Sequence, residues 1–261
     1  MYIKTSCEIH DKIEIEKHYP GRFGAPGMPR EKKKKKTPED VARQNYWRRC
    51  RELRRTMELN FGAGDFHVTL TCRKDERPSK EEATKVIRKF RDDLRKAYKK
   101  QGWELKYIIT CETGERGAVH WHMIVNNMHS SATSTSSMIN KLWKLGRTYI
   151  SPMDDSGDYK LLAEYIVKET SRRMENEETI EKLSYMISRN LIRPKVKEEK
   201  VRARSWRMEP TVPPGWVLVP GTLVNGLNKF TGWPYQHYTI RKEAGTDEDS
   251  GYLHRHKHKG T

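Results

Sequence analysis

The chain has 261 residues, and its 52 Lys and Arg outnumber its 35 Asp and Glu, which gives a formal net charge of +17. Hydrophobic residues make up 34 % of the chain, below the roughly 45–50 % of an ordinary globular protein. No apolar run approaches the roughly 20 residues that cross a bilayer, and the N-terminus lacks the apolar core of a signal peptide. We therefore expect no membrane association and a cytoplasmic location.

The cysteines and the charge narrow the class of protein further. Cys7, Cys50, Cys72 and Cys111 form no C-x-x-C pair, so reduced thiols are the simplest interpretation. A positive excess of this size indicates a polyanionic partner, most often nucleic acid. Charge alone does not say what happens to the phosphates of that partner.

Residues 1–63 are predicted to form a basic loop followed by a helix. The segment 18–37 combines glycines and prolines with five consecutive lysines, which favours a flexible basic loop. Thr37 is a suitable N-cap, followed by proline, for a helix that runs to about Leu59. The arginines of this helix fit either a solvated surface or contact with DNA. The candidate DNA contacts in this region are Lys32, Lys33, Lys34, Arg51 and Arg54.

Residues 64–172 alternate between strand and helix patterns. The predicted elements in chain order are a strand at 66–71, a helix at 80–100, strands at 105–112 and 118–126 with a hairpin loop at 113–117, a short helix at 138–145, a strand at 148–151 and a helix from Asp158 to about Thr170. This order predicts an α+β fold, in which helices flank a central antiparallel sheet.

The chain changes character after this core. We expect a basic helical or connecting segment at 173–204 and an appendage of short strands and turns at 205–243, where tryptophans and prolines gather. The segment 244–261 is predicted to be a disordered tail.

The strongest local signal for chemistry is the triplet His120-Trp121-His122 in an apolar strand. Residues two apart in a strand point to the same side, so both imidazoles share one face. If the hairpin loop sets Glu112 opposite Ala118, then Thr110 faces His120, and the carboxylate of Glu112 lies on the histidine face as well. Two histidines on a polar strand face need no metal, but the register of Glu112 favours a site for Mg²⁺ or Mn²⁺.

A second signal is the helical stretch Tyr165-Ile166-Val167-Lys168. Positions three apart are neighbours on a helix, so the Tyr165 phenol and the Lys168 ammonium lie together at the edge of the buried face. A phenol with a pKa of about 10 becomes a useful nucleophile when a nearby cation lowers that pKa. Standing alone, the pair would be an ordinary core tyrosine beside a solvated lysine.

The three motifs F-H-V-T-L-T, E-x7-H-W-H and Y-I-V-K, in this order, resemble the HUH endonucleases that initiate rolling-circle replication of bacterial plasmids and single-stranded DNA phages. The resemblance covers about residues 64–172. It implies that His120 and His122, with Glu112 as third ligand, hold Mg²⁺ or Mn²⁺, and that Tyr165 is the nucleophile, assisted by Lys168.

The reaction implied by the resemblance is a transesterification on single-stranded DNA of the replication origin, either linear or within a hairpin. Tyr165 forms a 5′-phosphotyrosine link, and the released 3′-OH primes a host polymerase. We take Thr69 and Thr71 of the first motif and Arg116 of the hairpin loop as further candidate DNA contacts. The chain has no G-x4-G-K-[ST] phosphate loop, so strand separation is expected from a host helicase or from supercoiling.

Other functions share parts of this pattern. Two-histidine phosphoesterases need a second H-x-[ST] motif, and histidine-triad hydrolases need a third alternating histidine where Ile124 stands. A transposase or a relaxase-like nickase would share the HUH core, although relaxases usually place their tyrosine before the histidines. A non-catalytic origin-binding protein would keep the basic surface without needing Tyr165 or the metal ligands.

Overall fold

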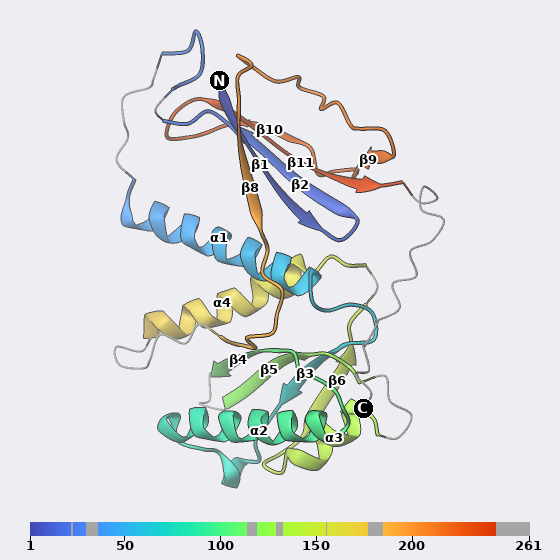
Figure 1. The fold of residues 1–261 in the computed structure, drawn as a ribbon. Helices are drawn as coiled ribbons and strands as arrows, with labels where there is room; N and C mark the ends of the chain where they lie inside the picture. Colours follow the sequence, from blue (N-terminus) through green and yellow to red (C-terminus); the bar gives the residue numbers. More distant parts are fainter. Residues whose placement is uncertain are drawn as a thin grey trace. The chain divides into compact units, whose positions relative to one another are not determined.

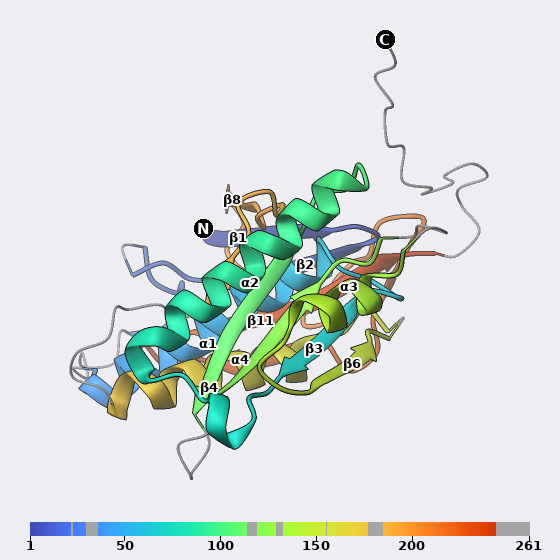
Figure 2. The same cartoon turned by 90° about the horizontal axis from the view of Figure 1, so that it is seen from below.

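The computed structural model describes residues 1–21, 23–29, 36–113, 119–128, 133–154, 156–176 and 185–243 (Figures 1 and 2). The chain divides into two units. One unit is Thr37–Pro194, and the other joins the two ends of the chain, Met1–Lys36 and Lys195–Thr261. Each unit contains an antiparallel sheet, and the predicted α+β class is confirmed.

The sheet of the first unit has the order β6-β3-β5-β4-β7, with every neighbouring pair antiparallel. Its strands are β3 (Phe66–Leu70), β4 (Tyr107–Thr113), β5 (Val119–Val125), β6 (Thr148–Pro152) and β7 (Met186–Ile187). The predicted strands of the 64–172 core are all present. The two-residue strand β7 comes from the segment that we expected to be helical or connecting.

Helices cover both faces of this sheet, as Figure 1 shows. The helices are α1 (Pro38–Glu58), α2 (Lys80–Lys100), α3 (Thr135–Leu142) and α4 (Lys160–Asn176), with a 3-10 turn at Lys74–Glu76. On one face, Val68 and Trp121 pack with residues of α2 and α3. On the other, Ile108 and Ile124 pack with residues of α1 and α4. The two-residue alternation of the strands therefore gives the sheet two buried faces of different composition.

The ends of the helices follow from local sequence. Thr37 caps α1 in a capping box with Asp40, and Ser79 caps α2 in the same way with Glu82, so both predicted starts are confirmed. Ser134 caps α3, which starts at Thr135 rather than at the predicted residue 138. The polar run before α3 thus supplies the cap and the first turn of the helix.

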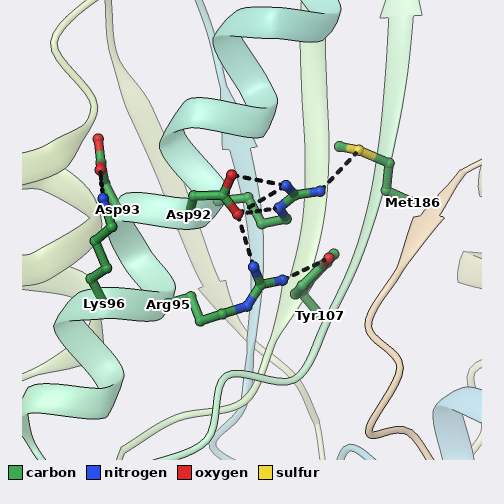
Figure 3. A network of polar contacts seen from close by, with 7 residues as sticks. Asp92, Asp93, Arg95, Lys96, Tyr107 and Met186 are labelled. Carbon is green, nitrogen blue, oxygen red and sulfur yellow. Dashed lines mark hydrogen bonds and ion pairs between the residues drawn. The ribbon is translucent and has the colours of Figure 1, made fainter.

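A polar network fixes α2 against the β4–β7 edge of the sheet (Figure 3). The guanidinium of Arg91 binds the Asp92 carboxylate at 2.8 Å and donates to the sulfur of Met186 in β7 at 4.0 Å. Arg95 binds the same carboxylate at 2.8 Å and donates to the Tyr107 hydroxyl in β4 at 3.2 Å. Two arginines of one helix thus connect it to both strands.

The second unit is a sheet of six strands in the order β10-β11-β2-β1-β8, with β9 paired to β11. Its strands are β1 (Tyr2–Ile9), β2 (Lys12–His18), β8 (Val196–Val201), β9 (Trp216–Leu218), β10 (Val224–Leu227) and β11 (Pro234–Lys242). β11 pairs with β2 along seven residues, and β1 pairs with β8 along six.

This second sheet corrects the five-segment organisation expected from sequence. The 205–243 region contains the predicted short strands and turns, but it forms part of this sheet and is not a separate appendage. The N-terminal residues contribute a hairpin that we did not predict, although Ile13 and Ile15 alternate with charged residues. The segment 173–204 contains the strands β7 and β8 after α4 ends at Asn176. The tail 244–261 lies outside the described residues.

Candidate functional site

The β4–β5 hairpin places Glu112 directly opposite His120, and Thr110 opposite His122. The sequence analysis set each residue of β4 two positions away from this partner, and that register was wrong. Pairing extends to Thr113 and Val119, so the turn is centred one residue later than predicted. A shift of two keeps every side chain on its face, which is why the grouping of Glu112 with the histidines survived the error.

Glu112, His122 and Tyr165 meet in one hydrogen-bonded cluster formed by β4, β5 and α4. The Tyr165 hydroxyl donates to Glu112 Oε2 at 2.7 Å and lies 3.0 Å from His122 Nε2. The same Oε2 lies 2.8 Å from His122 Nε2. Helix α4 presents Tyr165 at this point because its neighbours Ile166 and Val167 are buried between α1 and the sheet.

His122 is also held by strand β3. Thr69 Oγ1 lies 3.2 Å from His122 Nδ1, and a hydroxyl can donate to or accept from either tautomer of the ring. The His67 ring stacks on the His122 ring, with centroids 5.6 Å apart and planes at 20°. The sequence analysis treated Thr69 as a DNA contact and gave His67 no role, although their alternation with Phe66, Val68 and Leu70 placed both on this face.

The electrostatics keep the Glu112 carboxyl ionised. Partial burial raises its pKa, but hydrogen bonds from Tyr165 and His122 and the positive charge of His122 and His120 lower it more, so the net pKa lies below the ordinary value. His67 behaves in the opposite sense for a base, since burial and the neighbouring His122 lower its pKa to about 4. The cluster therefore pairs a carboxylate with a neutral supporting imidazole.

The donor atoms suit a divalent cation, although the described residues do not include three preassembled His, Cys, Asp or Glu ligands. Two imidazoles and a carboxylate share this face, and His120 is only half-buried. His67 Nε2 and Thr110 Oγ1, on the strands that flank β5, are buried without a hydrogen-bond partner among the described residues. Unsatisfied polar atoms beside His122 indicate room for a further polar group.

The other candidate tyrosines lie away from this cluster. Tyr159 is buried, and its hydroxyl donates to the carbonyl oxygen of Asp154 at 3.4 Å. Tyr185 is half-buried beside α1, where burial raises its pKa. Lys168 is exposed on α4, one turn beyond Tyr165. The geometry therefore brings one tyrosine to Glu112 and His122.

The candidate DNA contacts of the basic N-terminal region divide into three groups. Lys32, Lys33 and Lys34 lie outside the described residues, as does Arg116 of the hairpin loop. Arg51 is exposed on α1. Arg54 instead pairs with Glu58 at 2.9 Å, and the two side chains are only 18 % and 5 % exposed, so its charge is already used inside the unit.

Helix α1 has a structural role that its arginines concealed. Its Cys50, Leu53 and Met57 are buried in the cluster that contains Ala163 and Ile166 of α4. The Tyr46 hydroxyl also donates to the carbonyl oxygen of Glu164 at 3.4 Å. α1 therefore supports the helix that carries Tyr165.

With this geometry in place, the class of protein follows from comparison. Residues 65–170 match the family model of replication-associated proteins of the ORF2 type. The matched segment runs from the start of β3 into α4 and contains Glu112, His120, His122, Tyr165 and Lys168. The resemblance to rolling-circle replication initiators is thus confirmed over this segment, and such a family implies binding to DNA.

No curated protein and no solved structure matches the chain. Within the part of the chain that the structure describes, no helix is long and apolar enough to cross a membrane.

Proposed function

We propose that this protein is a replication initiator that nicks single-stranded origin DNA by transesterification onto Tyr165. The observation that carries the proposal is the convergence of Tyr165, Glu112 and His122, with 2.7 Å and 3.0 Å separating the phenol oxygen from the carboxylate and imidazole atoms. A buried structural tyrosine would need only one acceptor. Here the phenol lies on the two side chains that the motif pattern singled out as metal ligands.

The proposed step exchanges one phosphodiester for another. The phenol oxygen of Tyr165 forms a bond to the scissile phosphorus, while the bond from phosphorus to the 3′ oxygen breaks. The phenolic proton leaves the tyrosine, and the departing 3′ oxygen takes up a proton to become a hydroxyl. The product is a 5′-phosphotyrosine link, so no water is consumed, and the phosphodiester is conserved for later rejoining.

His120, His122 and Glu112 would hold the Mg²⁺ or Mn²⁺ ion. When bound, the ion would supply a Lewis acid that stabilises negative charge on the phosphate oxygens. The lowered pKa of Glu112 suits this role, since a carboxylate that stays ionised is a better ligand than a general base. Thr69 keeps the His122 ring oriented through its other nitrogen.

Lys168 would balance negative charge near the phenolate. It lies one helical turn from Tyr165 and is exposed, so DNA can approach it without rearrangement of the helix. The free 3′-OH would prime a host polymerase in the bacterial cytoplasm, and a host helicase would separate the strands.

The experiment is a covalent-adduct assay. The protein is incubated with Mn²⁺ and a panel of single-stranded segments from its own replicon, and a denaturing gel reveals a protein–DNA adduct. We expect an adduct with the wild type, none with Tyr165→Phe, and wild-type levels with Tyr185→Phe as the matched control. A non-catalytic origin-binding protein would bind the same DNA and give no adduct, which would contradict the proposal.

A further inference from the structure

The site lies in a row of side chains that crosses the sheet and ends at an exposed aromatic residue. In register, Thr110 of β4 faces His122 of β5, His122 faces Thr69 of β3, and Thr69 faces Tyr149 of β6. All four side chains point to the face that carries Tyr165. With neighbouring strands about 4.8 Å apart, the backbone of Tyr149 lies about 10 Å from that of His122.

Tyr149 is uncovered in spite of its size. Its side chain is 56 % exposed, and its hydroxyl makes no hydrogen bond to any residue that the structure describes. The helices explain the exposure, because the apolar cluster of α1 and α4 takes its sheet residues from β4, β5 and β7. Strand β6 lies at the sheet edge beyond β3 (Figure 2), and its Ser151 on the same face is also exposed.

The backbone beside Tyr149 is held in place by the residue that follows strand β3. The Thr71 hydroxyl donates to the carbonyl oxygen of Arg147 at 3.0 Å and accepts from the Arg147 amide at 3.2 Å. Gly146 permits this approach, since a Cβ there would lie 2.2 Å from the Thr71 carbonyl oxygen. Thr71, a candidate DNA contact from sequence, thus fixes the position of Arg147, whose own side chain is exposed.

The charge around this edge suits a polyanion. The chain has no Asp or Glu from residue 119 to residue 153. The same stretch contains Lys141, Lys144 and Arg147, and all three are exposed. An exposed aromatic ring beside several cations is the usual composition of a surface that binds single-stranded nucleic acid, in which bases stack on the ring and cations contact the backbone.

We propose that Tyr149 is a base-stacking residue that positions the single-stranded DNA substrate beside the nicking site, with Arg147 contacting its backbone. The inference rests on the proposed function for the identity of the strand. The ring lies in the row of His122, so a base stacked there places the scissile phosphate a few nucleotides away, over Tyr165. Duplex DNA offers no free base face, so this contact discriminates between single and double strands.

The test measures binding apart from chemistry. Fluorescence anisotropy with a labelled single-stranded 20-mer of thymidylate is recorded in EDTA, in a Tyr165→Phe background that cannot form the adduct. Tyr149→Ala is expected to weaken binding about 5- to 150-fold, the equivalent of roughly 1–3 kcal/mol per stacked base. Tyr149→Phe and Tyr149→Trp, which keep a ring, should bind within about twofold of the parent.

Two further readouts separate stacking from a general loss of affinity. An oligonucleotide with one 2-aminopurine should lose fluorescence on binding to the parent and keep it with Tyr149→Ala. Arg147→Gln should lower the slope of log affinity against log salt by about 0.7, the value for one phosphate of a single strand. Trp47→Ala removes a 48 % exposed aromatic of α1 and serves as the control that binds like the parent.

The inference is overturned if Tyr149→Ala binds the thymidylate 20-mer and quenches 2-aminopurine as the parent does, or if Trp47→Ala loses as much affinity. Its failure is distinguishable from that of the proposed function. If the wild type forms no adduct while binding still depends on Tyr149, only the nicking reaction is refuted. If the adduct forms and Tyr149→Ala binds normally, only the stacking role is refuted.

Discussion

Replacement of Thr69 by valine removes one hydroxyl beside His122 and leaves a β-branched side chain of nearly the same shape in β3. The Oγ1 atom of Thr69 lies 3.2 Å from His122 Nδ1, and the His122 side chain is only 10 % exposed. Water therefore has little access to replace the lost partner. A buried polar atom left without a hydrogen bond costs about 1–3 kcal/mol, and loss of the partner that orients a metal-binding histidine typically costs about 10- to 100-fold in metal affinity.

The assay is a calorimetric titration of Mn²⁺ into the protein without DNA. We expect Thr69→Val to bind Mn²⁺ about tenfold more weakly and Thr69→Ser, which keeps the hydroxyl, to bind within about threefold of the wild type. Thr71→Val is the matched control, since Thr71 bonds to the backbone of Arg147 and not to His122. If Thr69→Val binds Mn²⁺ as tightly as the wild type, the orienting role assigned to Thr69 is refuted.

Three other perturbations test the energetics of the same unit. His67→Phe keeps the stacked ring but removes a base whose pKa is lowered from 6.5 to about 4. The wild type binds more protons when unfolded, so it should lose up to about 3 kcal/mol of unfolding free energy between pH 6.5 and pH 4, and the variant should lack that loss in chelator-containing urea titrations. Gly146→Ala should cost about 1–3 kcal/mol because its Cβ meets the Thr71 backbone, whereas Gly62→Ala, with nothing within 4 Å, should cost under about 1 kcal/mol. Leu53→Ala should cost about 2–5 kcal/mol in chemical denaturation and reduce adduct formation, since Leu53 is buried where α1 packs on α4; unchanged stability would contradict the supporting role of α1.

Much of the nicking unit could be predicted because its signals are local. A threonine and a serine with an acidic residue three positions later set the starts of α1 and α2. The two-residue period of β5 put His120 and His122 on one face. The same period kept Glu112 beside them in spite of a register error, because an error of two does not exchange the faces.

The remaining features depend on contacts between distant parts of the chain. The strand pair of β2 and β11 joins residues such as His18 and Tyr235, and no local pattern shows that the two ends of the chain share one sheet. The arginines of α1 suggested a DNA-binding surface, but its Leu53 packs against α4. The role of Thr69 follows from a neighbour 53 positions away, which hydrophobic periodicity alone does not identify.

The central claim is that the phenol of Tyr165 attacks the scissile phosphate. It is tested most directly by mass spectrometry of the covalent adduct after nuclease and protease digestion, which locates the residue that carries the 5′-phosphate. The account predicts a phosphonucleotide on Tyr165 alone. A phosphonucleotide on Tyr159 or Tyr185, or an adduct that persists in Tyr165→Phe, would contradict it.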